Sequence, residues 1–127
     1  QTQAPEQKNK EDQTEKNKES DATKIVSEVL SPSDFEAKFK ATEGAQLIDV
    51  RTPGEVADGT LENATNINFK EADFKEKMAK LDKNKPVFVY CQGGVRSAKA
   101  ASACKEMGFK EIYDMEGGYG SYEASKH

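Results

Sequence analysis

The 127-residue sequence contains no tryptophan, one histidine and two cysteines. Structural zinc sites use about four cysteine or histidine ligands, so this count leaves no room for a multi-ligand zinc site and no metal is expected. Long apolar runs are also missing, since none approaches the roughly 18 to 20 residues of a membrane span. There is no excess of positive charge either, because the net charge is −4, which argues against a nucleic-acid-binding protein.

Apolar residues are scarcest at the amino terminus. Residues 1–24 carry six acidic residues and five lysines, and their only apolar residues are two alanines and one proline. Such a segment cannot bury enough surface to offset the entropy lost on ordering, so we predict a disordered charged tail or tether. Residues 25–127 then form one small domain of about one hundred residues.

The charged leader and the first residue, Gln1, bear on cellular location. A first residue other than methionine indicates that something upstream was removed. A charged spacer before a compact domain is similar to that of an exported, lipid-anchored bacterial protein. We therefore expect a periplasmic or membrane-tethered protein in preference to a cytoplasmic one. The alternative is a cytosolic protein with a naturally disordered terminus, and two cysteines do not decide the compartment.

Strand-like and helix-like segments alternate along residues 25–127. The predicted strands are short apolar or β-branched runs: Ile25–Leu30, Gln46–Val50, Asn66–Phe69, Pro86–Tyr90 and Ile112–Met115. The predicted helices begin at a capping-box pair, Ser33 and Glu36, cover Phe74–Leu81 and Ser97–Met107, and follow Gly117-Gly118. This alternation predicts an α/β fold in which a mostly parallel sheet of about five strands has helices on both faces.

Three places in this pattern come directly after a predicted strand. In parallel sheets, ligands bind beyond the carboxyl ends of the strands. The three candidate positions are therefore Asp49–Arg51, Asn68–Phe69 and, above all, Cys91.

The segment after the fourth predicted strand, CQGGVRS, carries the chemistry. Cys91 follows the strand at once, and Gly93 and Gly94 let the backbone curl with positive φ and turn N–H groups inward. The helix amino terminus, the Arg96 guanidinium and the Ser97 hydroxyl also favour negative charge. We therefore expect Cys91 to react as a thiolate, and the same N–H groups to hold a persulfide anion on its sulfur. The alternative is a small buried packing residue.

Four parts of the sequence resemble the single-domain rhodanese (sulfurtransferase) family. They are Leu47-Ile48-Asp49-Val50-Arg51-Thr52-Pro53-Gly54-Glu55, Ala64-Thr65-Asn66-Ile67-Asn68, Tyr90-Cys91 through Arg96-Ser97, and Gly117-Gly118-Tyr119. They occur in the family's order and spacing, and the resemblance covers nearly all of residues 25–127 but none of residues 1–24. It implies the rhodanese-like three-layer fold for the domain.

The resemblance implies a sulfurtransferase with Cys91 as the catalytic nucleophile. Cys91 would receive a sulfane sulfur from thiosulfate or a persulfide donor and pass it to a thiophilic acceptor such as a thiol. The active-site loop would consist of Gln92, Gly93, Gly94, Val95, Arg96 and Ser97. No cofactor is implied, and we expect a monomer. A non-catalytic rhodanese-homology binding module and a dedicated persulfide carrier are the alternatives.

The resemblance also implies supporting roles for Asp49 and Arg51, which lie beside the loop. We expect Asp49 to brace the loop by hydrogen bonds and Arg51 to pair with an acid such as Glu55. The alternative for both is a surface-facing turn at the end of a strand.

Loop length separates two chemistries within this fold. Arg96 lies five positions after Cys91. Relatives that act on phosphate or arsenate have a loop one residue longer, with the arginine one position later. The shorter loop suits a single sulfur atom better than a tetrahedral oxyanion, so the sequence disfavours a phosphatase or an arsenate reductase.

The sequence departs from the family at several positions. Gln92 and Gly93 stand where many active members have arginine or lysine. This difference predicts weak thiosulfate binding and a preference for a neutral or thiol-borne persulfide. Thr60 follows Gly59 in place of the family's histidine, and Asn63 replaces a glycine.

Four further residues carry predictions. Cys104 falls on the apolar face of its helix, which predicts a core residue; the alternative is a resolving cysteine for Cys91, although two helical turns separate them. Tyr119 and Tyr122 are expected to pack in the core, or alternatively to wall the pocket mouth. His127 is the final residue and is not expected to act as a general base.

Overall fold

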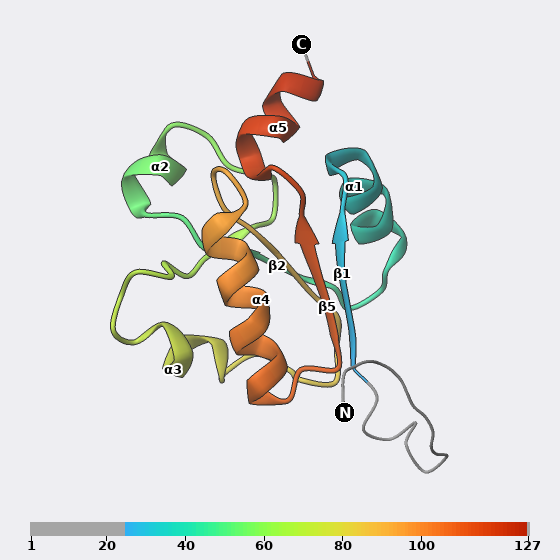
Figure 1. The fold of residues 1–127 in the computed structure, drawn as a ribbon, viewed down its shortest axis with the longest axis vertical. Helices are drawn as coiled ribbons and strands as arrows, with labels where there is room; N and C mark the ends of the chain where they lie inside the picture. Colours follow the sequence, from blue (N-terminus) through green and yellow to red (C-terminus); the bar gives the residue numbers. More distant parts are fainter. Residues whose placement is uncertain (1–24, 127) are drawn as a thin grey trace, which may run out of the picture.

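The computed structural model describes residues 25–126, so the predicted tail of residues 1–24, the tethering inferred from it, and His127 lie outside the described range. The described residues form one sheet of five parallel strands together with five helices (Figure 1). The strands are β1 (Val26–Leu30), β2 (Gln46–Asp49), β3 (Thr65–Asn66), β4 (Val87–Tyr90) and β5 (Glu111–Met115). The helices are α1 (Pro32–Ala41), α2 (Pro53–Ala57), α3 (Phe74–Met78), α4 (Val95–Met107) and α5 (Gly118–Ser125).

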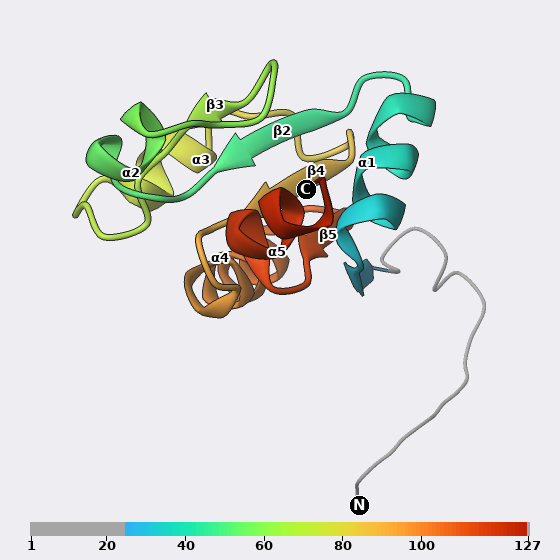
Figure 2. The same ribbon diagram turned by 90° about the horizontal axis from the view of Figure 1, so that it is seen from above.

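The strand order β1-β5-β4-β2-β3 places β4 in the middle of the sheet and β1 at one edge. Every residue of β4 is buried, as expected for a strand covered on both faces. Side chains of α3 and α4 pack on one face of the sheet, and side chains of α1 and α5 pack on the other. Figure 2 shows α1 and α4 on opposite sides of the sheet. The predicted three-layer α/β fold is confirmed.

The starts of α1 and α2 follow local capping chemistry. The first helix begins at Pro32, and the Ser31 hydroxyl accepts a backbone N–H three residues on at 3.2 Å. The prediction of a capping box at Ser33 is wrong, because proline lacks an N–H and has a fixed φ that suits the first helical position. A capping box is present instead at α2, between Thr52 and Glu55.

The shorter elements differ most from prediction. Strand β3 has only two residues and ends at Asn66, where a strand continuing to Phe69 is predicted. Helix α3 ends at Met78, although Leu81 still packs against the core. Helix α2 is not predicted, because its five residues are too few to show an apolar period.

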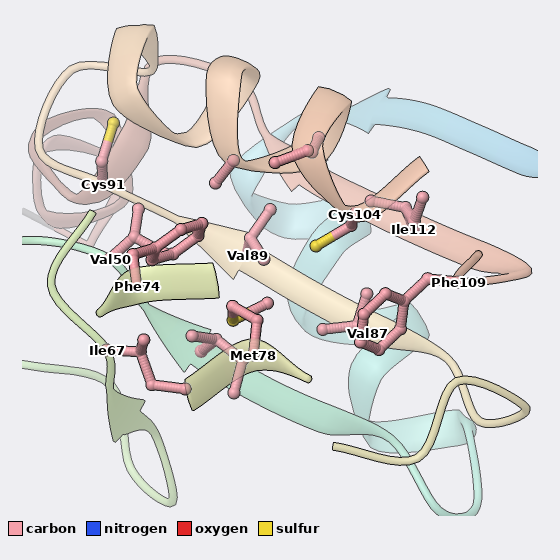
Figure 3. Close-up of a cluster of buried hydrophobic side chains, with 14 residues drawn as sticks. Val50, Ile67, Phe74, Met78, Val87, Val89, Cys91, Cys104, Phe109 and Ile112 are labelled. Carbon is pink, nitrogen blue, oxygen red and sulfur yellow. The ribbon is translucent and has the colours of Figure 1, made fainter. Parts of the chain in front are cut away.

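The larger hydrophobic cluster lies between the sheet and helices α3 and α4 (Figure 3). Cys104 is fully buried in it, and burial raises the pKa of its thiol to about 12. Cys91 lies at the edge of the same cluster, beyond Val89 (Figure 3), and both thiols are free. The predicted core role of Cys104 is therefore confirmed. Among residues 25–126, no helix has the length and apolar character needed to cross a bilayer.

Candidate active site

Cys91 lies at the carboxyl edge of the sheet, directly after the central strand β4, and is buried. Asp49, the last residue of β2, is in register with Tyr90 of β4, so the segments that follow these two strands lie side by side. The structure thus brings Asp49 and Arg51 to the loop, as predicted. The side-chain oxygen of Asn68, the third candidate position, accepts a hydrogen bond from the Lys70 amide at 3.0 Å in a local turn.

Backbone N–H groups point at the Cys91 sulfur. The Gly94 amide lies 3.0 Å from Sγ and the Ser97 amide 3.2 Å away, while the Ser97 hydroxyl oxygen lies 3.4 Å from Sγ. Of the two loop glycines only Gly94 has a positive φ, of 100°, so the curl predicted for both depends on Gly94 alone. These donors and the amino terminus of α4 stabilise negative charge on the sulfur.

Helix α5 holds the loop from the other side. The Tyr119 amide donates to the Cys91 carbonyl at 2.7 Å, and the Gly120 amide donates to the Gln92 carbonyl at 3.1 Å. A Cβ at Gly118 would collide with both of these carbonyl oxygens, and Gly118 also has a positive φ of 66°. Glycine is therefore required there, because the backbones of the two segments approach each other closely.

Arg51 is the residue that braces the loop. Its guanidinium binds Asp49 through Nε at 2.9 Å and Nη2 at 2.7 Å, and donates to the Gln92 side-chain oxygen at 3.0 Å and the Gly59 carbonyl at 2.6 Å. Both charged side chains are 1% exposed. Burial opposes ionisation of Asp49, but hydrogen bonds from Arg51, Thr60 and Tyr90 together outweigh it and lower the pKa of the carboxyl group. The expectation that Asp49 itself braces the loop is therefore wrong: Asp49 holds Arg51.

Glu55 pairs with Arg96, and the expected ion pair with Arg51 is wrong. The two carboxylate oxygens of Glu55 lie 2.8 and 2.9 Å from Nη1 and Nη2 of Arg96. This pairing lowers the pKa of Glu55 to about 2, against the opposing effect of burial. The Thr52 amide also donates to Glu55 at 3.1 Å, within the capping box of α2. The only guanidinium of the predicted loop is thus bound by an acid rather than directed at the sulfur.

Two departures from the family pattern have local explanations. The Thr60 hydroxyl donates to Asp49 at 2.9 Å and lies 2.7 Å from the Tyr90 hydroxyl, so threonine supplies a polar contact beneath the loop. Asn63 has a φ of 71°, a left-handed conformation that asparagine tolerates better than other residues with a Cβ. The backbone that favours glycine at this position is therefore kept.

A recess of about 320 Å³ opens beside the loop. Its lining consists of Arg51, Glu55, Asp58, Gln92, Tyr119 and Glu123. The Arg51 guanidinium carbon lies 4.4 Å from the centroid of the Tyr119 ring, so Tyr119 forms part of the wall of the recess. Tyr122 instead lines a separate groove beside α1. Within residues 25–126, no three histidine, cysteine or acidic side chains are grouped to hold a metal ion.

Asp114 in β5 is a residue that the sequence analysis missed. It is buried, and burial raises the pKa of its carboxyl group to about 6. The Ser97 hydroxyl, which contacts the Cys91 sulfur, has the opposite effect and lowers the pKa of Asp114. The available signal was an acid within the otherwise apolar run Ile112–Met115.

Comparison with protein families and curated proteins agrees with this geometry. The family described as Rhodanese-like domain matches residues 31–125. An uncharacterized Bacillus subtilis protein, YqhL, is 36% identical over 94 residues, covering 74% of this chain and 71% of that protein. A tRNA uridine(34) hydroxylase of Cytophaga hutchinsonii is 36% identical over 105 residues, covering 80% of this chain. The match spans only 33% of that hydroxylase.

Solved structures share the fold. A rhodanese-related protein of Thermoplasma volcanium superposes with a TM-score of 0.66 at 29% identity, covering 82% of this chain and 94% of the other. A rhodanese-like domain protein of Staphylococcus aureus gives a TM-score of 0.65 at 28% identity, covering 77% and 91%.

Proposed function

Because the chain belongs to the family of rhodanese-like domains, we propose that it is a sulfurtransferase whose Cys91 carries a sulfane sulfur as a persulfide. The proposal rests on the surroundings of the Cys91 sulfur, which lies 3.0 Å from the Gly94 amide and 3.2 Å from the Ser97 amide. Backbone donors at a helix amino terminus stabilise an anionic sulfur before and after transfer. The proposed partners are a small sulfur donor and a thiol acceptor, and the proposed state is a monomer.

The first half-reaction forms the persulfide. The Cys91 thiolate attacks the outer sulfur of the donor, a sulfur–sulfur bond forms on Cys91, and the sulfur–sulfur bond of the donor breaks. The leaving group is sulfite from thiosulfate, or a thiolate from a thiol persulfide. The attack needs no general base once the sulfur is a thiolate.

The second half-reaction removes the sulfane sulfur from Cys91. A nucleophilic acceptor, cyanide in an assay or a thiol, attacks the terminal sulfur, and Cys91 leaves as a thiolate that returns to the amides of Gly94 and Ser97. The first amides of α4, at Val95 and Arg96, have no acceptor within the helix and are suited to the terminal sulfur. The protein thus provides a preorganised set of donors for whichever sulfur bears the charge.

The charges around the recess favour a thiol persulfide over thiosulfate as donor. Arg96 is bound by Glu55 through two hydrogen bonds, and Arg51 is bound by Asp49. The lining also includes Asp58 and Glu123. A thiosulfate dianion would approach acidic groups and two guanidinium groups that are already paired. The hydroxylase relatives are named for an activity on tRNA. We do not extend that activity to this chain, because its net charge of −4 disfavours nucleic-acid binding.

The test is the intact mass of the protein after brief incubation with thiosulfate or, separately, with a thiol persulfide. We expect a gain of one sulfur atom, faster with the thiol persulfide, and its loss on adding a reductant. Cys91→Ser should gain none, while Cys104→Ala is the matched control and should gain sulfur as the wild type does.

Two results would overturn the proposal. Sulfur gain in Cys91→Ser would place the carrier elsewhere. No gain with either donor would favour the alternative of a non-catalytic recognition module.

A further inference from the structure

Gln92 directly follows Cys91 and contributes a carboxamide to the lining of the recess beside the loop. Its side-chain oxygen accepts a hydrogen bond from Nη1 of Arg51 at 3.0 Å. A guanidinium group has N–H donors and no acceptor, so this contact fixes which end of the carboxamide faces Arg51. The nitrogen at the other end, Nε2, therefore points away from Arg51.

Arg51 lines the same recess but has no N–H group left for a ligand. Its five N–H groups are used by the Asp49 carboxylate, the carbonyls of Glu55 and Gly59, and the side-chain oxygen of Gln92. Arg51 can therefore act on a ligand only through Gln92. A hydrogen bond from a charged group to the carboxamide oxygen strengthens the N–H donors at the opposite end of the carboxamide.

The N–H groups of Gln92 Nε2 are open to solvent. Within residues 25–126, the contact with Arg51 is the one side-chain hydrogen bond of Gln92. Asp114 Oδ1 is the single buried side-chain nitrogen or oxygen without a partner in that range, so Nε2, which has no partner there, is not buried. A Cβ at Gly120 in α5 would lie 3.5 Å from Nε2, and glycine leaves that side of the nitrogen uncovered.

The charges around Nε2 select the group that it binds. Asp58 and Glu123 line the recess and are exposed, and no ion pair between described residues involves either of them. Their negative charge disfavours a carboxylate or a sulfur oxyanion beside Nε2, and Arg96 does not offset it because Glu55 holds its guanidinium. A neutral carbonyl oxygen accepts a hydrogen bond from Nε2 without this repulsion.

We propose that Gln92, oriented by Arg51, determines the specificity of sulfur transfer by donating a hydrogen bond from Nε2 to an amide carbonyl of the thiol partner. Arg51 is the positioning residue, and Gln92 contacts the substrate. Because Gln92 adjoins Cys91, Nε2 reaches only groups close to the transferred sulfur. The substrate class is a cysteine persulfide flanked by neutral amide groups, as in a peptide. The inference rests on the proposed function, in which Cys91 receives the sulfur.

Two measurements on the full-length protein test the proposal. The first compares sulfur gain from two neutral donors: the persulfide of N-acetylcysteine methylamide, which has amide carbonyls, and the persulfide of 2-mercaptoethanol, which has none. Its readout is the ratio of the two rate constants by intact mass, in which a general effect of a substitution on Cys91 cancels. The second follows the side-chain amide signals of Gln92 by NMR while an unreactive thioether, N-acetyl-S-methylcysteine methylamide, is added.

Three substitutions separate recognition of the substrate from bracing of the loop. Gln92→Met removes the carboxamide. Gln92→Glu keeps an oxygen that can accept from Arg51 but replaces the Nε2 donor. Gln46→Met is the matched control, because it makes the same chemical change at the first residue of β2, at the edge of the parallel sheet opposite to the loop.

We expect the ratio of the amide donor to the 2-mercaptoethanol donor to fall about fivefold in Gln92→Met, the effect of one hydrogen bond. It should fall at least as far in Gln92→Glu, because a carboxylate repels the carbonyl oxygen. Gln46→Met should keep the wild-type ratio. The side-chain amide signals of Gln92 should move when the thioether is added, and those of Gln46 should not.

A wild-type ratio in Gln92→Met, or Gln92 side-chain signals that do not respond to the thioether, would overturn the inference. A wild-type ratio in Gln92→Glu would overturn it as well, because Gln92 would then only brace the loop. The NMR readout requires no persulfide. Failure of the proposed function would therefore appear as an absence of sulfur gain with both donors while the Gln92 signals still respond.

Discussion

The buried ion pair between Asp49 and Arg51 makes a quantitative prediction. Replacing Arg51 by methionine keeps an unbranched side chain but removes six hydrogen-bond contacts, three to the Asp49 carboxylate and one each to the Glu55 carbonyl, the Gln92 side chain and the Gly59 carbonyl. Asp49 is 1% exposed and would remain as a buried charge without its partner. Breaking a buried pair in this way costs about 3–5 kcal/mol, a large fraction of the stability of a small domain.

The assay is urea unfolding near neutral pH, with the midpoint and the slope compared between variants. Arg51→Lys keeps the charge but not the planar fork, so it should lose at least about 1.5–3 kcal/mol, the contribution of one hydrogen bond to a charged group. The double variant with Asp49→Asn should recover part of the loss, because the uncompensated charge is gone. An Arg51→Met protein within about 1 kcal/mol of the wild type would refute the reasoning.

Three further predictions concern single side chains. The pKa of Asp114 is raised from 3.8 to about 6 in the folded state, so the folded protein holds this proton more tightly than the unfolded chain does. The unfolding free energy should therefore fall by up to about 3 kcal/mol as the pH rises from 3.8 to about 6, when compared with Asp114→Asn. Parallel curves of unfolding free energy against pH for the two proteins would contradict this. Glu55→Gln should release Arg96 for anion binding, so persulfide formation from thiosulfate should rise on the order of tenfold in the mass assay, and an unchanged rate would show that the pair does not limit this donor. Cys104→Ala should lower the unfolding free energy by about 1 kcal/mol and Cys104→Ser by about 2–3 kcal/mol, because the serine hydroxyl would be buried; equal losses by urea unfolding would argue against a dry core at this position.

Local signals were sufficient to locate the Cys91 loop. An apolar strand, Cys91 directly after it, two glycines and the start of a helix all lie within residues 87–97, and the structure places the sulfur at the amino terminus of α4 as those residues predict. Their hydrogen bonds run between near neighbours in the chain. Short-range geometry therefore decides them.

Which acid pairs with which arginine could not be predicted in the same way. Asp49, Arg51 and Glu55 lie within seven residues of one another, and Arg96 is far along the chain. Chain proximity favours Arg51 with either acid. The structure assigns Asp49 to Arg51 and Glu55 to Arg96, because the capping box of α2 turns Glu55 toward the start of α4.

The sequence by itself determined the α/β class, the position of Cys91 at the end of a buried strand and the helix that begins after it. Periodicity, glycine conformation and capping are local properties, and each depends on only a few consecutive residues. Only the tertiary structure decided that Gly118 contacts the loop and that Arg51 braces Gln92. Each of these contacts joins strands or helices whose register and packing depend on the whole sheet, so no pattern along the chain encodes the distance between them.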